Sequence, residues 1–96
     1  MRHIYLVTYD ISDNARLRRV FKKMRGYGEH LQYSVFQCEL SGKERAQMIA
    51  DLTPLINHRE DQILIFTLGP AEGYNTSSTF AIGKPYDFVE RHAIVV

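Results

Sequence analysis

The hydrophobic pattern changes abruptly between residues 3 and 28, and this change limits the folds open to the chain. Residues 3–9 (HIYLVTY) are apolar at both odd and even positions, which is typical of a buried strand. The strand stops at Asp10, and Ser12 or Asp13 can then cap a helix. That helix has apolar residues at i, i+3, i+4 and i+7, namely Leu17, Val20, Phe21 and Met24, and it ends at Gly26 and Gly28. A strand followed by an amphipathic helix therefore opens the chain.

The side of this helix away from its apolar stripe is strongly basic. Its cations are Arg16, Arg18, Arg19, Lys22, Lys23 and Arg25. Residues 1–25 carry a net charge of +5 and the remainder −4, so the overall charge of +1 conceals a segregated distribution. Such segregation creates a local positive field that attracts polyanions, although a charge run more often marks a solvated helix face. Both interpretations are open from the charges alone.

A second helix and further strands complete the pattern. The helix begins at Ser41, which has capping-box spacing with Glu44, and Pro54 kinks or ends it. Strands are expected over residues 31–40, 61–68, 79–82 and 92–96.

This order favours an α+β fold of two layers. Taken literally it is βαβαββ, whereas a ferredoxin-like sandwich has the order βαββαβ. The two orders agree if residues 31–40 bend near Ser34 into a hairpin. We therefore predict a ferredoxin-like two-layer sandwich in which an antiparallel sheet carries two helices on one face. The 96 residues form one domain, 1–96, and residues 92–96 add a short C-terminal strand.

Two helices cover only one face of such a sheet, yet strands 3–9 and 61–68 are apolar on both. An exposed apolar patch of this size usually marks an interface, and most soluble oligomers are twofold dimers. The terminal strand 92–96 (HAIVV) would also be an unpaired apolar edge unless it joins a sheet, which can be the partner's. The sequence thus predicts a homodimer.

Asp10 is the first candidate for chemistry. Functional groups are commonly presented at the carboxyl ends of buried strands, and Mg²⁺ is typically held by one or two carboxylates while it keeps several waters. In a twofold dimer, two copies of Asp10 could share one metal and activate water for attack on a phosphodiester. The alternative is that Asp10 only caps the first helix, for which Asp13 is the better candidate.

Two further groups of residues are candidates for substrate contact. Arg16, Arg18 and Arg19 could clamp phosphates, or they could be solvated side chains. Tyr9 and Phe36 could stack on bases or orient a substrate, although an aromatic residue within a strand more often belongs to the core.

The location of the protein is suggested by its cysteine content and its N-terminus. Cys38 is the one cysteine, so an intramolecular disulfide is excluded and a reducing cytoplasm fits. The apolar run near the N-terminus is only about as long as a strand, and it resembles neither a signal peptide nor a membrane span. We expect a cytoplasmic protein that does not associate with membranes.

Two sequence segments together resemble a known family. Residues 9–13 (YDISD), the arginine-rich helix, Gly28 and the segment QYSVFQCEL, with Gln32, Ser34, Val35 and Phe36, are similar to the CRISPR-associated endoribonuclease 2 family. The resemblance covers nearly the whole chain. It implies a ferredoxin-like homodimer whose last strand joins the partner's sheet. Two positions depart from the family pattern, because His30 stands where arginine is frequent and Gln37 where glutamate often follows SVF.

The resemblance also implies a site and a function. Asp10 would bind Mg²⁺ at the dimer interface and support phosphodiester hydrolysis of RNA or DNA in CRISPR adaptation, the acquisition of spacers. Tyr9, Arg16, Arg18, Arg19, Ser34 and Phe36 occupy motif positions and would contribute to catalysis or nucleic-acid binding.

Two other functions stay open. In the first, the dimer is a non-catalytic scaffold that bridges integrase subunits in the spacer-integration complex and contacts duplex DNA. In the second, it is a regulatory domain for a small ligand, which would not need six exposed cations on one helix. Steep weakening of nucleic-acid binding with salt would argue against the second.

Overall fold

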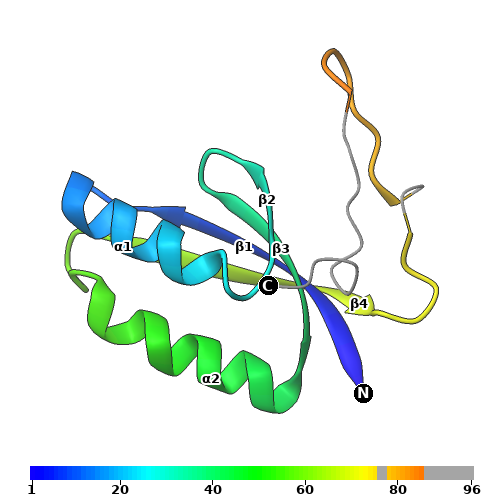
Figure 1. Ribbon diagram of the computed structural model, residues 1–96, viewed down its shortest axis with the longest axis horizontal. Helices are drawn as coiled ribbons and strands as arrows, with labels where there is room; N and C mark the ends of the chain where they lie inside the picture. Colours follow the sequence, from blue (N-terminus) through cyan, green and yellow to red (C-terminus); the bar gives the residue numbers. More distant parts are fainter. Residues whose placement is uncertain (76–77, 86–96) are drawn as a thin grey trace.

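The computed structural model describes residues 1–75 and 78–85. The elements in chain order are β1 (Arg2–Asp10), α1 (Asn14–Met24), β2 (Glu29–Gln32), β3 (Val35–Ser41), α2 (Gly42–Leu52), the short 3₁₀ helix η1 (Thr53–Leu55) and β4 (Gln62–Pro70) (Figure 1). This βαββαβ order confirms the predicted ferredoxin-like α+β sandwich.

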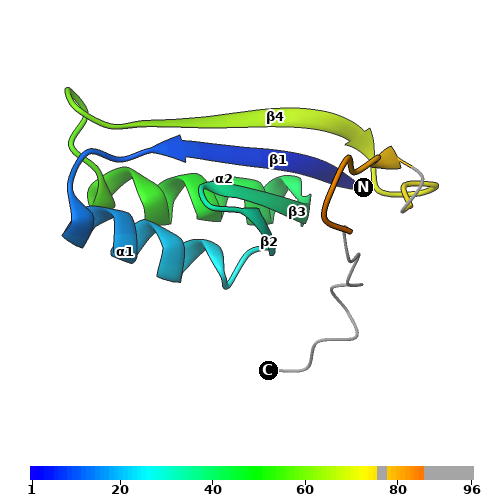
Figure 2. The same ribbon diagram turned by 90° about the horizontal axis from the view of Figure 1, so that it is seen from above.

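The four strands form one antiparallel sheet in the order β2-β3-β1-β4. β1 is central, and its last residues pair with the beginnings of both neighbours, Thr8 with Val35 and Asp10 with Gln62. Both helices lie on the same side of this sheet (Figure 2). The end of β1 therefore emerges between two strands and close to the start of α1.

The region expected as one strand over residues 31–40 is instead a hairpin. A turn at Tyr33 and Ser34 separates β2 from β3. Ser34 lies just before β3, and its carbonyl oxygen accepts a hydrogen bond from the Tyr9 amide at 3.1 Å. This hairpin converts the literal βαβαββ order into the ferredoxin-like one, as a bend near Ser34 was expected to do.

The prediction of a strand at residues 79–82 is wrong. These residues have no strand pairing, and the apolar side chains of Phe80 and Ile82 are exposed, so β-propensity there is not supported by a neighbouring strand among the described residues. The strand expected at 92–96 lies outside the described residues.

Both helices begin at side-chain caps. Asp13 is the N-cap of α1, where its Oδ2 accepts a hydrogen bond from the Arg16 amide at 2.9 Å. α2 begins with the predicted capping box: Ser41 Oγ accepts from the Glu44 amide at 3.1 Å, and Glu44 Oε1 accepts from the Ser41 amide at 2.9 Å. Each cap satisfies amide groups that the first turn of a helix leaves unpaired.

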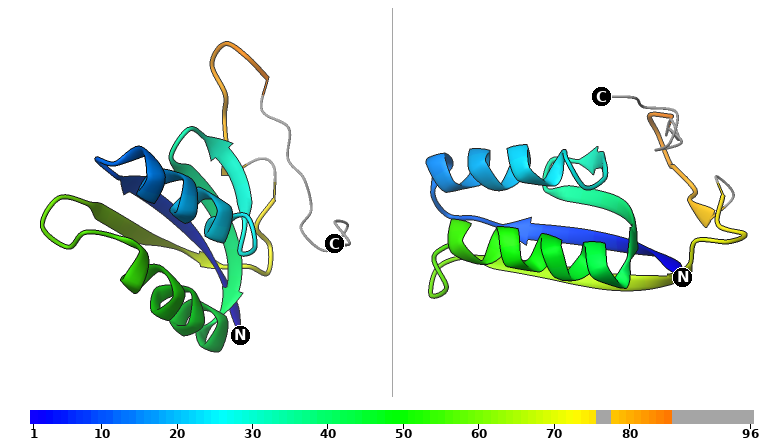
Figure 3. Two further views of the ribbon diagram at one scale, coloured as in Figure 1. Left: turned by 60° about the vertical axis from the view of Figure 1, so that its left-hand side comes forward. Right: turned by 60° about the horizontal axis from the view of Figure 1, so that its bottom comes forward.

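The core lies between the helices and the sheet. The two helices run side by side (Figure 3) and contribute Val20, Met24, Met48 and Leu52. The sheet contributes Tyr5, Val7, Tyr9, Phe36, Cys38 and Leu40. Leu17 and Phe21 pack against this cluster, which confirms the apolar stripe predicted for the first helix.

Gly28 marks the closest approach of the α1–β2 connection to β3. A Cβ atom at this position would meet the Gln37 carbonyl oxygen and the Cys38 sulfur well inside van der Waals contact. Only a residue without a side chain lets the connection pass this close to the neighbouring strand.

The helix-free face of the sheet is partly apolar and open. Leu64, Phe66 and Leu68 of β4 are 43–47% exposed, whereas Ile63 and Ile65 on the other face pack against the core. Within residues 1–75 and 78–85, β4 pairs only with β1 and is an edge strand. Neither helix is long and apolar enough to span a membrane, as far as the described residues show.

Candidate functional site

Asp10 lies at the carboxyl end of β1, and its side chain is exposed. The helix cap that follows is Asp13, so the capping role considered for Asp10 is excluded. The Asp10 carboxylate makes no hydrogen bond or ion pair within the described part of the chain. This carboxylate is therefore available to a cation or a substrate.

Tyr9 points to the opposite face of the sheet from Asp10, because side chains alternate along a strand. It is buried, and its ring stacks beside that of Phe36 with centroids 6.2 Å apart. Burial raises the pKa of Tyr9 to about 12, and its hydroxyl is buried without a hydrogen-bond partner among the described residues. Tyr9 thus holds the end of β1 against the core directly behind Asp10.

Phe36 of β3 and Ser34 of the turn before it support the same end of β1. Phe36 is 0% exposed, and its ring is covered by those of Phe21 and His30 at 5.7 and 5.0 Å. No base can stack on the Phe36 ring in this arrangement. Phe36 is a core residue, which was the alternative to base stacking considered from the sequence. Ser34 is half-buried in the turn beside Tyr9.

Arg16 does not lie on a free basic face. Its side chain is 22% exposed, and its Nε donates to Asp61 Oδ2 at 2.8 Å while Nη2 donates to Glu60 Oε1 at 3.1 Å. A guanidinium held by two carboxylates is a poor candidate for a phosphate clamp. Its place in this ion pair instead fixes the first turn of α1.

Asp61 is the residue of this region that sequence reasoning missed. Its side chain is 0% exposed, and it also accepts hydrogen bonds from the amides of Ser12 and Asn57 at 3.0 and 2.8 Å. The hydrogen bond from Arg16 is the largest cause of a pKa for Asp61 that is well below its usual range. Arg16 and Asp61 are far apart in sequence, so no local pattern could reveal the pair.

The remaining cations of α1 and its C-cap residue are exposed: Arg18, Arg19, Lys22, Lys23 and Arg25. Phe21 identifies the flank that faces β2, since its ring contacts that of His30 at 5.0 Å. Arg18 and Arg25 lie three residues before and four after Phe21, so they share this flank, and the Arg25 guanidinium lies 5.8 Å from the Phe21 ring centroid. We call Arg18, Arg19, Lys22 and Arg25 the basic ridge.

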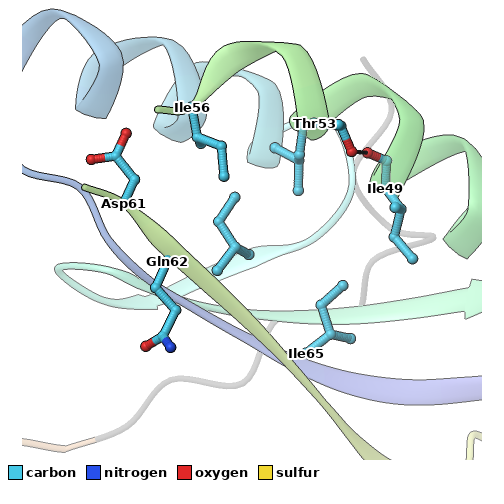
Figure 4. Close-up of a pocket in the computed structure, with 8 residues that line it drawn as sticks. Ile49, Thr53, Ile56, Asp61, Gln62 and Ile65 are labelled. Carbon is cyan, nitrogen blue, oxygen red and sulfur yellow. Dashed lines mark hydrogen bonds between the residues drawn. The ribbon is translucent and has the colours of Figure 1, made fainter. Parts of the chain in front are cut away.

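An apolar groove of about 300 Å³ lies elsewhere, between α2, η1 and β4 (Figure 4). Its walls include Ile49, Ile56 and Ile65, with Asp61 at the end near α1. The Asp61 carboxylate points toward α1 and its ion pair with Arg16 (Figure 4). The groove does not include Asp10, so it is separate from the candidate site.

The donor groups fit a metal that needs few protein ligands. In residues 1–75 and 78–85 no group of three acidic, histidine or cysteine side chains could form a complete cage. Mg²⁺ keeps several waters and is commonly bound through one or two carboxylates, so the exposed carboxylate of Asp10, which has no partner in the described part of the chain, suits it.

Comparison with known proteins decides the family. The family model described as CRISPR associated protein Cas2 matches residues 1–74. The chain belongs to the Cas2 family. The CRISPR-associated endoribonuclease Cas2 of Geobacter sulfurreducens is 45% identical over the full length of both chains. A relative from Rhodospirillum rubrum, CRISPR-associated endoribonuclease Cas2 1, is 44% identical over 98% of this chain and 91% of its own.

Solved structures of Cas2 proteins share the fold. The chain superimposes on Streptococcus pyogenes Cas2 with a TM-score of 0.73 and 30% identity, covering 83% of this chain and 99% of that one. A hypothetical protein, TT1823, from Thermus thermophilus gives a TM-score of 0.74 at 23% identity over 91% of this chain and 100% of that one, which supports the fold alone.

Proposed function

We propose that this Cas2-family protein is a Mg²⁺-dependent endonuclease that hydrolyses phosphodiester bonds of RNA, and of DNA where it reaches the same site, during CRISPR adaptation. The observation that carries the proposal is the carboxylate of Asp10, which is exposed at the end of β1 and unpaired among the described residues, in a chain whose next element is a helix with exposed cations. The names of the Geobacter sulfurreducens and Rhodospirillum rubrum relatives, both endoribonucleases, support it.

Each part of the site has a distinct role in this proposal. Asp10 holds the metal, and Mg²⁺ when bound supplies positive charge that polarises the phosphate and favours deprotonation of the attacking water. Arg18 and Arg19 on the basic ridge bind neighbouring phosphates as charged hydrogen-bond donors. Tyr9, Phe36 and the Ser34 carbonyl fix the end of β1, and Arg16 fixes the start of α1.

The active form in this proposal is a homodimer. The exposed apolar residues of β4 and its edge, which no strand of the described residues pairs with, are the surfaces that a second copy would cover. A second copy would also bring a second Asp10, so that two carboxylates could hold one ion. Cys38, the one cysteine, is buried, which is compatible with the reducing cytoplasm in which we place the protein.

The proposal is tested by incubating labelled single-stranded RNA and duplex DNA with the purified protein in Mg²⁺ or in EDTA. We expect cleavage of the RNA in Mg²⁺ and none in EDTA. The absence of cleavage of both substrates in Mg²⁺ would overturn it.

A non-catalytic scaffold is the second candidate, because the basic ridge and the open edge of β4 require no metal to bind DNA and a protein partner. In that role the dimer would bridge CRISPR integrase subunits. Binding of duplex DNA in EDTA at undiminished affinity, together with no cleavage in Mg²⁺, would favour the scaffold.

A further inference from the structure

Tyr33 is an exposed aromatic residue at the same end of the sheet as Asp10. It lies in the turn between β2 and β3, and it is 76% exposed. The other aromatic residues of this region, Tyr9 and Phe36, are buried in the core. Tyr33 is therefore the ring near Asp10 that a ligand can reach.

The sheet register places this turn beside Asp10. Thr8 pairs with Val35, and the Tyr9 amide donates to the Ser34 carbonyl at 3.1 Å. Tyr33 precedes Ser34 in the turn, and Asp10 follows Tyr9 as the last residue of β1. Tyr33 thus lies at the same end of the sheet as the candidate metal ligand.

The turn is anchored to the core through His30. His30 Nε2 lies within hydrogen-bonding distance, 3.3 Å, of the Tyr33 carbonyl oxygen. The His30 ring packs against Phe21, whose flank of α1 also carries Arg18 and Arg25. An exposed ring and an exposed carboxylate thus lie at one end of the sheet, and the flank of α1 that faces His30 carries exposed cations.

We propose that Tyr33 is a base-stacking residue for single-stranded RNA, and that its ring holds one base while cations of the ridge hold adjoining phosphates. Stacking on an aromatic side chain is tolerant of sequence, because every base has a π face. This inference rests on the proposed function, since it assigns part of the substrate contact at the same site.

The absence of tryptophan from the chain allows a direct test. Tyr33→Trp introduces a single tryptophan into the turn, and its fluorescence reports contact with a base. Glu72→Trp is the matched control, since Glu72 is exposed in a turn at the other end of the sheet, where the Ala71 amide donates to the Arg2 carbonyl. The probes are an oligoadenylate of about 12 nucleotides and an abasic chain with as many phosphates, both in EDTA.

We expect oligoadenylate to quench the tryptophan of the Tyr33→Trp variant, whereas the abasic chain does not, and neither probe quenches the Glu72→Trp variant. Tyr33→Ala should weaken oligoadenylate binding about tenfold and leave binding of the abasic chain unchanged, while Tyr33→Phe should bind like the wild type. Equal melting temperatures of these variants would show that the exposed turn was altered without loss of the fold. Absence of quenching by oligoadenylate, or equal quenching by the abasic chain, would overturn the inference.

The outcome is separable from that of the proposed function. Selective quenching together with no Mg²⁺-dependent cleavage by the wild type would support stacking and overturn hydrolysis. Cleavage by the wild type without quenching in the Tyr33→Trp variant would support hydrolysis and overturn stacking.

Discussion

Arg16 and Asp61 form an ion pair that joins the first turn of α1 to the residue before β4, with Arg16 Nε 2.8 Å from Asp61 Oδ2. Asp61 also accepts a hydrogen bond from the Ser12 amide. This one carboxylate therefore joins the segment that follows Asp10 in the chain to the start of β4, which pairs with Asp10. The pair separates the cations of α1 into one that holds the fold and others that remain exposed.

Replacing Arg16 should therefore affect mainly stability, whereas replacing Arg18 should affect mainly RNA binding. Arg16→Ala removes the partner of a buried carboxylate, and we expect a clear fall in melting temperature. Arg18→Ala leaves the melting temperature unchanged but weakens RNA binding, and it lowers the magnitude of the slope of log K against log salt by about 0.7, the amount for one single-strand phosphate contact. Thermal unfolding and RNA titrations at several salt concentrations measure both effects. A stable Arg16→Ala variant with reduced RNA binding would show that Arg16 is a phosphate ligand after all.

Stability should fall in acid because of Asp61. The pKa of this carboxyl is lower in the folded protein than its ordinary value of 3.8, so the unfolded chain binds more protons as the pH falls. The stabilisation is complete well above pH 3.8, and it is lost as the pH falls through 3.8 toward the folded-state pKa. Urea unfolding of the wild type between pH 7 and about 2.5 should show this loss.

Asp61→Asn is the control for the acid effect, since it removes the titrating group. The variant should be less stable at neutral pH and should lose less of its remaining stability below pH 3.8. If the free energy of unfolding of Asp61→Asn fell with decreasing pH as steeply as that of the wild type, other carboxylates would be the cause of the acid effect.

The comparison of sequence and structure shows which features local patterns can reveal. The apolar stripe of α1 and the Ser41–Glu44 capping box depend on spacing within a few residues, and both were predicted correctly. The hairpin at Ser34 was uncertain, because residues 31–40 have no glycine, proline or asparagine to mark a turn.

The site was predicted less completely than the fold. The helical pattern placed Arg16 with the other cations, because the position of a side chain on a helix does not show whether a distant carboxylate meets it. The carboxylate that Arg16 meets belongs to Asp61, which is 45 residues away in the sequence. The position of Asp10 was predictable because it depends only on where the first strand ends.

Gly28→Ala should destabilise the protein. The added methyl group would collide with the Gln37 carbonyl oxygen and the Cys38 sulfur, both parts of the central sheet. Overpacking of this kind typically costs about 1–3 kcal/mol. Gly26→Ala is the control, because its Cβ would lie 3.4 Å from the Lys23 carbonyl oxygen, an ordinary contact. Equal free energies of unfolding for the two variants would contradict this account of Gly28.

Phe66→Asp should weaken the proposed dimer. Phe66 is 47% exposed on β4, so a charge there is harmless to an isolated chain but costly within an apolar interface. Loss of a central interface residue commonly costs about 2 kcal/mol or more, which raises the Kd about 30-fold. Light scattering across a concentration series measures this change. A wild type that is monomeric at all concentrations, or a variant that dimerises equally well, would exclude β4 as the interface.

The most direct test of the catalytic proposal compares Asp10→Asn with Asp13→Asn in Mg²⁺-dependent cleavage of single-stranded RNA. Both changes remove one negative charge from the same turn, and asparagine at position 13 still caps α1. We predict that Asp10→Asn lowers the cleavage rate by more than about 100-fold at an unchanged melting temperature, since even outer-shell changes at metal sites cost 10–100-fold. Asp13→Asn should retain most of the activity. Equal cleavage by the wild type and Asp10→Asn would contradict the assignment of Asp10 as the metal ligand.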